Sequence, residues 1–459
     1  MVRQGVGAGR HRPNPSFVHR IAVLLFLVLW LDVGCESSPD AHIPMFSDGG
    51  LLRGGTPLTR EQLYGLEGVF SLNEGSALLG NDVSLRTSPG TVSLLTDLNA
   101  GFAVLGAACL LEGQVVIEGY WQYPTRVEAG LVRLFVEPPS VARALCNGEV
   151  SAPSPELTLR GHYGEGQQLP GRPLSLVWTR ELKPWRGRFL TVAHHGACEP
   201  TDHCGVSPNS IETIRLAERT GSNAIELDVR ATRDGFPVLF HDPHLSVALV
   251  QGLFCNGKLE DLSLVDLRGS CLLKNGEILP TVEEALDVAI DETELEGLYL
   301  DMKVPEAVLP SARLLSIALA DLDARNSNDD PADDRQFGAV IAITTDEVLQ
   351  AWRSARATLE AEGLRVPPCL LEYDPDLVLS EGCVAWGPTW TSGPQVDNVE
   401  RLREAGAATV YWTINQSDFI DEFLTQAQPD GIISSRSALL FHRYQTIGTP
   451  PPLTEGEVP

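Results

Sequence analysis

Short apolar runs alternate with polar turns between residues 61 and 182. Runs of this length, separated at regular spacing by turns that contain Gly, Pro and Asn, are typical of antiparallel strands. The pattern therefore predicts a small all-β accessory domain over residues 61–182, built as a sandwich or a small barrel. No catalytic constellation falls within it. The predicted strands cover residues 83–87, 91–98, 102–111, 115–123, 131–136, 157–163 and 174–179.

The pattern changes after Trp185, where strand-like apolar runs alternate with stretches long enough for helices. Eight such strands in about 250 residues match a TIM (β/α)8 barrel, an α/β fold that we predict over residues 186–445. Chemistry in this fold lies at the carboxyl ends of the strands. The predicted strands cover residues 190–194, 224–229, 298–304, 339–343, 369–373, 383–386, 409–414 and 431–434, and the predicted helices cover residues 211–220, 282–290, 310–323, 347–362, 399–405 and 418–426.

The N-terminal sequence indicates that the protein is exported. Several Arg residues precede an apolar run at residues 21–31, which is shorter than the roughly 20 residues that a membrane-spanning helix needs. We therefore expect a signal peptide at residues 1–34. Val33-Gly34-Cys35 is similar to a bacterial lipoprotein signal, so Cys35 would carry a lipid and attach the protein to a membrane of the cell envelope. Plain cleavage, giving a periplasmic or secreted protein, is the alternative. Residues 36–60 read as a linker and residues 446–459 as a flexible tail.

The net charge limits the kinds of partner that we expect. The net charge of −27 comes without any basic cluster, which argues against nucleic acid and favours a bound cation. Six Asp residues within 321–334 lack the spacing of a calcium-binding loop, so we read that segment as solvated.

In an exported chain, the eight cysteines after Cys35 suggest disulfides, and proximity alone favours sequential couples. These couples are Cys109 with Cys146, Cys198 with Cys204, Cys255 with Cys271, and Cys369 with Cys383.

Polar side chains gather where the predicted barrel strands end. Side chains alternate along a strand, so residues two apart point to one face. Glu226 therefore shares a face with Asp228, and Asp301 shares one with Lys303. The full set at the strand ends is His194, His195, Glu226, Asp228, His241, Asp301, Lys303 and Trp412.

Three converging carboxylates repel each other unless a cation lies between them, and oxygen ligands suit Mg²⁺ or Ca²⁺. Two imidazoles can serve as general acid and base, and a Lys can neutralise an anionic oxygen. The set therefore predicts displacement at the phosphorus of a phosphodiester, aided by one divalent cation.

Several motifs follow one another along residues 189–440. They are His194-His195-Gly196, Pro208-Asn209-Ser210, Ile225-Glu226-Leu227-Asp228-Val229, Thr232-Arg233-Asp234-Gly235-Phe236-Pro237-Val238, His241-Asp242, Leu279-Pro280-Thr281-Val282-Glu283-Glu284, Tyr411-Trp412-Thr413-Ile414-Asn415 and Asp430-Gly431-Ile432-Ile433. In their kind and order, these motifs resemble those of the glycerophosphodiester phosphodiesterase family, a TIM barrel with an insert after its second strand.

The resemblance implies a small-molecule or lipid-derived phosphodiester as substrate, hydrolysed to glycerol phosphate and an alcohol. The roles that it implies are the acid/base pair for His194 and His241, metal ligation for Glu226, Asp228 and Asp301, phosphate contact for Lys303, and pocket shape for Trp412.

Four departures from the family pattern bear on the site. His195, which we predict to bind substrate phosphate, stands where the family has Arg. We expect its ring to be largely neutral at pH 7, in place of a guanidinium that binds phosphate through two hydrogen bonds. Pro208 replaces Glu, and Asp301 replaces a Glu that is one methylene longer. Ser434-Ser435 replaces Thr-Asp.

Two other readings stay open. Sphingomyelinase D-like phospholipases share the barrel and have an Asp at the third metal position, as Asp301 is here. A non-catalytic binding lipoprotein, in which the β domain does the work, is the second. The extra residues after Gly196, with Cys198 and Cys204, are expected to form a disulfide-closed loop over the site.

Overall fold

The computed structural model describes residues 43–149, 152–326 and 335–447. The predicted signal peptide, Cys35, most of the tail and residues 327–334 of the Asp-rich segment lie outside the described residues. Export and a lipid on Cys35 therefore stay predictions. Across the described ranges, no helix combines the length and apolar character needed to cross a bilayer.

The first sheet is an antiparallel barrel of eight strands, which resolves the choice between sandwich and barrel. Each strand pairs with its neighbour in the order β5-β4-β3-β2-β9-β8-β7-β6, and β5 pairs with β6 to close the ring. Leu85, Leu94, Val132 and Leu176 are fully buried in its centre. The strands are β2 (Gly68–Glu74), β3 (Asp82–Ser88), β4 (Thr91–Leu95), β5 (Phe102–Cys109), β6 (Val115–Gln122), β7 (Ala129–Glu137), β8 (Thr158–Tyr163) and β9 (Arg172–Arg180), with helices α2 (Arg60–Tyr64), α3 (Ser76–Leu79) and α4 (Pro139–Cys146).

The described part of the predicted linker, residues 43–60, contacts the first barrel. Residues 43–60 pack against the first barrel, and the short strand β1 (Thr56–Pro57) pairs with β5. Leu52 donates its backbone N–H to Glu118 Oε1 over 2.9 Å, and Leu58 is buried. The Ser-, Pro- and Gly-rich composition reflects turns held by these contacts, and not a free tether.

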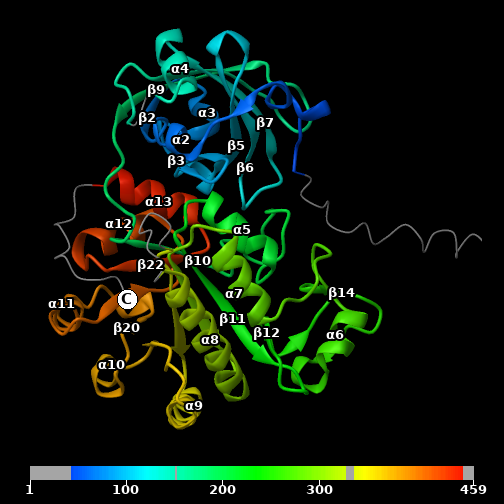
Figure 1. Cartoon of the computed structure of the whole chain (residues 1–459), viewed down its shortest axis with the longest axis vertical. Coiled ribbons are helices and arrows are strands. Elements are labelled where there is room, and N and C mark those ends of the chain that lie inside the picture. The colour runs from blue at the N-terminus through cyan, green and yellow to red at the C-terminus, as the bar shows by residue number, and fades with distance from the viewer. Residues whose placement is uncertain (1–42, 150–151, 327–334, 448–459) are drawn as a thin grey trace, which may run out of the picture. The chain divides into compact units, whose positions relative to one another are not determined.

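The second sheet is the predicted TIM barrel, drawn from green to red in Figure 1. Eight parallel strands pair in the order β10-β22-β21-β20-β19-β18-β17-β11, and β10 pairs with β11 to close the ring. The strands are β10 (Leu190–His194), β11 (Ala224–Ala231), β17 (Gly297–Met302), β18 (Gly338–Ile343), β19 (Cys369–Leu371), β20 (Ala385–Trp386), β21 (Ala408–Tyr411) and β22 (Gly431–Ser434). Helices follow the strands: α5 (Ile211–Arg219), α7 (Val282–Asp291), α8 (Val308–Asn326), α9 (Asp346–Glu362), α10 (Pro375–Glu381), α11 (Val396–Glu404), α12 (Ser417–Gln426) and α13 (Ser437–Thr446).

Strand alternation decides which residues face the barrel axis. Leu190, Val192, Ala224, Tyr299 and Val340 belong to a buried cluster of inward-facing side chains. Their strand neighbours face outward and pack against the helices in a larger cluster, for example Leu227, Leu298 and Ile341. A residue two positions beyond the last inward apolar residue therefore points into the barrel mouth.

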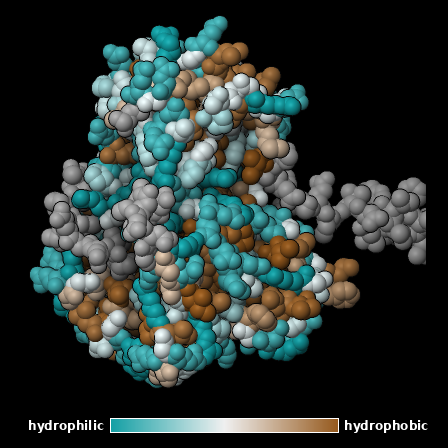
Figure 2. Space-filling model, in the orientation of Figure 1, coloured by the Kyte–Doolittle hydropathy of each residue, from teal (hydrophilic) through white to brown (hydrophobic). Residues whose placement is uncertain are grey.

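The insert between β11 and α7 is a separate small lobe (Figure 1). It contains β12 (Pro237–Leu239), β13 (His244–Leu245), β14 (Val250–Gln251), β15 (Gly257–Lys258), α6 (Leu264–Ser270) and β16 (Leu272–Leu273). Apolar side chains are exposed on it, and brown atoms gather over this lobe in Figure 2. These exposed residues are Val247, Leu253, Phe254 and Val265.

All four proximity-based cysteine pairs are confirmed as disulfides. They join Cys109 to Cys146, Cys198 to Cys204, Cys255 to Cys271, and Cys369 to Cys383.

The two barrels belong to one compact unit and contact each other through described residues. Arg86 of β3 is buried, lies 4.2 Å from the Trp185 ring centroid and donates to Ser222 O over 3.0 Å. Ser84 Oγ lies 3.1 Å from His442 Nδ1 on α13. The division near residues 182–186 separates β9 from β10, and its reading as a boundary between independent domains stays a prediction.

Candidate active site

The predicted carboxylates meet at the mouth of the second barrel. In the register of the sheet, Glu226 lies beside His194, and Asp228 lies beside Asp301. Glu226, Asp228 and Asp301 each offer an oxygen, and these three oxygens lie within 4.8 Å of one another. The alternation rule thus correctly placed both the Glu226–Asp228 pair and Asp301 on the inner face.

The donor set fits a hard divalent cation. Glu226 Oε1 and Asp301 Oδ1 are buried and have no hydrogen-bond partner among the described residues. Buried carboxylate oxygens without a partner are costly unless a positive group neutralises them. Oxygens at this separation can converge on Mg²⁺ or Ca²⁺. A second cluster, His194, His195 and Glu199, also has ligand atoms within 4.8 Å, but Ser435 already hydrogen-bonds to His194 Nδ1 and to Glu199 Oε1.

Asp228 is held from two sides. Asn209, whose backbone adopts φ 58°, donates from Nδ2 to Asp228 Oδ2 over 2.7 Å and accepts the Asp228 backbone N–H over 3.0 Å. Lys303 Nζ lies 2.9 Å from Asp228 Oδ1 and also pairs with Asp301. Burial opposes ionisation of Asp228, but His195 and Lys303 outweigh it and lower its pKa well below the usual value.

The charges of Asp228 and its neighbours shift the pKa values of Glu226 and Lys303. Burial, followed by repulsion from Asp228, raises the pKa of Glu226 to about 8. Burial opposes the charge on Lys303, yet Asp228 and Asp301 together raise its pKa above the usual value. A cation bound between the carboxylates would remove the repulsion that raises the pKa of Glu226.

His195 is charged, which corrects the expectation of a largely neutral ring. Burial alone would lower its pKa, but Asp228 Oδ2, 3.0 Å from His195 Nε2, raises that pKa to about 9. The backbone of His195 adopts φ 52° and donates its N–H to Glu226 Oε2 over 3.1 Å. The side chain therefore pairs with a predicted metal ligand, and it does not line the main cavity.

The two predicted acid/base histidines line one cavity of about 610 Å³. His194 is largely buried, and burial, followed by the charge of His195, lowers its pKa to about 4. His194 Nε2 lies 4.0 Å from Glu226 Oε2. The side chain of His241 is half exposed, and its Nδ1 lies 2.7 Å from Asp242 Oδ1. Lys303 and Trp412 line the same cavity, and Trp412 donates Nε1–H to Gly387 O over 2.6 Å.

Two groups at the site were missed from the sequence. Glu372 lines the cavity, and burial together with the charge of Asp301 raises its pKa well above the usual value. The predicted strand 369–373 contained the signal, because alternation from inward-facing Leu370 puts Glu372 on the same face. Glu199 lies in the Cys198–Cys204 loop, and no periodicity signals its contact with His194.

The sequence of the second barrel is similar to that of known proteins. Residues 200–337 match the glycerophosphoryl diester phosphodiesterase family. The chain is 27% identical over 262 residues to a probable glycerophosphodiester phosphodiesterase 2 of Mycobacterium tuberculosis, covering 55% of this chain and 90% of that protein. It is 31% identical over 109 residues to human glycerophosphodiester phosphodiesterase 1, covering 23% of this chain and 31% of that protein.

A search of solved structures found similarity to an Oleispira antarctica phosphodiesterase in complex with the product sn-glycerol-3-phosphate. That comparison has a TM-score of 0.43 and 19% identity, and it covers 56% of this chain and 97% of that one. The family match spans the three predicted metal ligands, His241 and Lys303, whereas His194, His195 and Trp412 lie outside it.

The raised pKa values of His195 and Glu226 predict that the cation-free protein becomes less stable at alkaline pH. Because the pKa of His195 is raised to about 9, its stabilising contribution is complete below about pH 6.5 and disappears as pH rises through 9. The raised pKa of Glu226 acts in the same direction, since the folded state favours its protonated form. With a chelator present, we expect Tm to fall from about pH 6.5 to about 9.

Added Mg²⁺ or Ca²⁺ should raise Tm more at about pH 9 than at about pH 6.5, because the carboxylates then bind the cation without proton competition. Thermal melts followed by circular dichroism measure both effects. A Tm that is independent of pH over this range, or a cation effect of equal size at both ends, would contradict the prediction.

Proposed function

We propose that the second barrel hydrolyses glycerophosphodiesters to glycerol phosphate and an alcohol, using a divalent cation bound by Glu226, Asp228 and Asp301. The chain carries a glycerophosphoryl diester phosphodiesterase family domain and is an enzyme of the phosphoric diester hydrolase class. The finer proposal is supported by one observation above all. Three carboxylates converge at one point, and two of them, Glu226 and Asp301, have a buried oxygen without a hydrogen-bond partner among the described residues. These two line one cavity together with His194 and His241.

The bound cation would supply Lewis-acid stabilisation of charge on the phosphoryl oxygens. Lys303 lies beside Asp228 and Asp301 and would neutralise the charge on another phosphoryl oxygen of the substrate. His194, which burial keeps unprotonated at neutral pH, would accept a proton from the attacking water. His241, whose half-exposed ring lines the cavity, would donate a proton to the departing alcohol oxygen. Trp412 would form one wall for the alcohol group.

A chelator titration with product analysis tests this proposal. We expect the purified protein to release glycerol phosphate from glycerophosphocholine or glycerophosphoethanolamine. EDTA should abolish turnover, and excess Mg²⁺ or Ca²⁺ should restore it. Release of glycerol phosphate that continues undiminished in EDTA would contradict the cation requirement.

A substrate panel separates the alternatives. Lysophosphatidylcholine and sphingomyelin converted to a cyclic phosphate would favour the sphingomyelinase D-like reading, which Asp301 at the third metal position supports. No turnover on any diester, with the protein folded and the cation bound, would favour the binding reading.

A further inference from the structure

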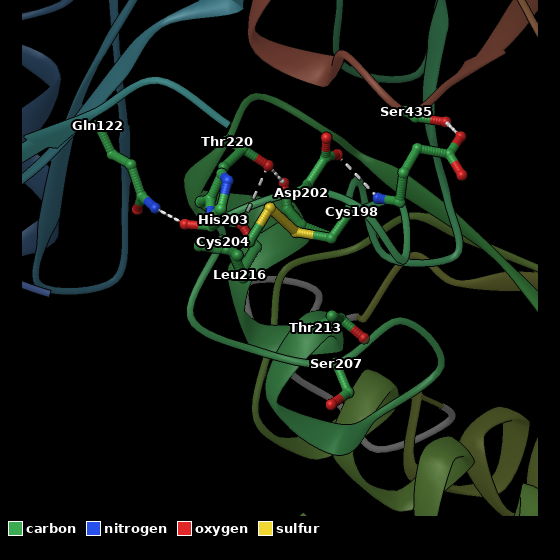
Figure 3. Close-up of a disulfide and its surroundings, with 12 residues drawn as sticks. Gln122, Cys198, Asp202, His203, Cys204, Ser207, Thr213, Leu216, Thr220 and Ser435 are labelled. Atoms are coloured by element: carbon green, nitrogen blue, oxygen red, sulfur yellow. Dashed lines mark hydrogen bonds between the residues drawn. A yellow bond between two sulfur atoms is a disulfide. The ribbon is translucent and has the colours of Figure 1, made fainter. Parts of the chain in front are cut away.

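The Cys198–Cys204 loop lies between β10 and α5 and is closed by a disulfide (Figure 3). Side chains from both barrels hydrogen-bond to it. Asp202 accepts two hydrogen bonds from the Arg436 guanidinium, over 2.6 and 3.1 Å, and its side chain is almost completely buried. Asp202 Oδ2 also accepts the backbone N–H of Glu199 over 2.8 Å. The disulfide and this ion pair together fix the position from which the Glu199 side chain projects.

The first barrel supports the same loop. His203 donates its backbone N–H to Pro124 O over 2.8 Å, and Gln122, the last residue of β6, donates Nε2–H to His203 O (Figure 3). The loop is thus held by hydrogen bonds from one barrel and by an ion pair from the other.

Glu199 reaches the catalytic end of β10 through Ser435. Ser435 Oγ donates to Glu199 Oε1 and lies 2.9 Å from His194 Nδ1. Glu199 Oε1 itself lies 3.4 Å from His194 Nδ1. Ser435 is fixed in turn, because Asn415 Oδ1 accepts its backbone N–H over 2.8 Å.

Counting protons in this group determines the tautomer of His194. A serine hydroxyl has one hydrogen, and Ser435 gives it to a carboxylate that has none to offer. The contact between Ser435 Oγ and His194 Nδ1 therefore requires the proton to be on Nδ1. In the neutral ring, Nε2, which lies on the side of Glu226, then presents a free lone pair.

We propose that Glu199 is a positioning residue that, through Ser435, holds His194 as the Nδ1–H tautomer with Nε2 ready to accept a proton. Ser435 stands where the family pattern has Asp, so the carboxylate that acts on this histidine comes from the disulfide-closed loop. The inference deepens the proposed function, since it rests on His194 as the base of the phosphodiesterase reaction.

The tautomer itself is the first test, and it does not depend on activity. In protein labelled with ¹⁵N-histidine, the His194 ring, assigned by its loss in His194→Ala, is expected to show a protonated Nδ1 and an unprotonated Nε2 at pH 7. Glu199→Gln should produce a mixture of tautomers. A wild-type ring with its proton on Nε2 overturns the proposal, even if Glu199→Gln fails to fold.

Kinetics provide the second test. Glu199→Gln is expected to lower kcat about tenfold, the size typical of groups that orient a catalytic ligand, with KM changed less than about threefold. Adding Ser435→Asp to Glu199→Gln should recover most of that loss, because a carboxylate then accepts directly from Nδ1. Glu360→Gln, an exposed change on α9, is the matched control and should leave kcat unchanged.

An unchanged kcat in folded Glu199→Gln, or a loss that Ser435→Asp does not recover at all, overturns the inference. Failure of the proposed function gives a different result. The wild-type protein would then turn over no diester, while the Nδ1–H tautomer would still be observed.

Discussion

Glu226→Gln is expected to lower kcat/KM by at least about a hundredfold, in line with the loss of a preorganised electrostatic group at developing charge. Glu226 is buried, and its Oε1 has no hydrogen-bond partner among the described residues. Gln has nearly the same shape but no charge, so the site loses one of its three anionic cation ligands. Calorimetric titration should show weaker binding of Mg²⁺ or Ca²⁺ together with the kinetic loss.

The same variant should stabilise the cation-free protein. Burial and Asp228 raise the pKa of Glu226, so ionising it at alkaline pH costs folding free energy that Gln does not incur. In EDTA at about pH 9, we expect a higher Tm for Glu226→Gln than for the wild type, whereas Glu360→Gln should leave both Tm and kcat/KM unchanged. Full activity with unaltered cation affinity would contradict the assignment of Glu226 as a ligand.

The inward-facing part of the site could be predicted because it follows strand alternation. On each of three strands, the site residues lie in steps of two after an inward-facing apolar residue. His194 follows Val192, Glu226 and Asp228 follow Ala224, and Asp301 follows Tyr299. Glu372 obeys the same rule, because it lies two residues after inward-facing Leu370 and lines the cavity.

The charge of His195 and the role of Glu199 could not be predicted in this way. His195 is charged because its backbone turns to φ 52° and places Nε2 on Asp228, a contact between consecutive strand ends. Glu199 reaches Ser435 across 236 residues of sequence, from a loop whose path depends on a disulfide and on Arg436. Contacts of this kind come from tertiary packing and have no local sequence signal.

The contacts of residues 43–60 also lack a local sequence signal. Gly, Ser and Pro mark turns as well as tethers, and composition does not distinguish the two. Within this segment Leu58 is buried, and β1 pairs with Ala108 and Cys109 at the end of β5.

His194→Ala and His241→Ala are each expected to reduce kcat on glycerophosphocholine by about 10²–10⁴, the usual contribution of a general acid or base. The two roles differ in what they do to the leaving group. A diester with a p-nitrophenol leaving group needs no protonation on departure. It should therefore restore kcat in the variant that lacks the acid, but not in the variant that lacks the base.

In the proposed function, His241, whose side chain is half exposed, is the acid, and His194, which burial keeps unprotonated, is the base. We therefore expect p-nitrophenyl substrates to rescue His241→Ala and not His194→Ala, as measured by release of p-nitrophenol. The reverse pattern would exchange the two roles. Because the histidines act on one transition state, the double variant should lose little more than the worse single variant. Independent, multiplicative losses would show that the two side chains do not act in the same step.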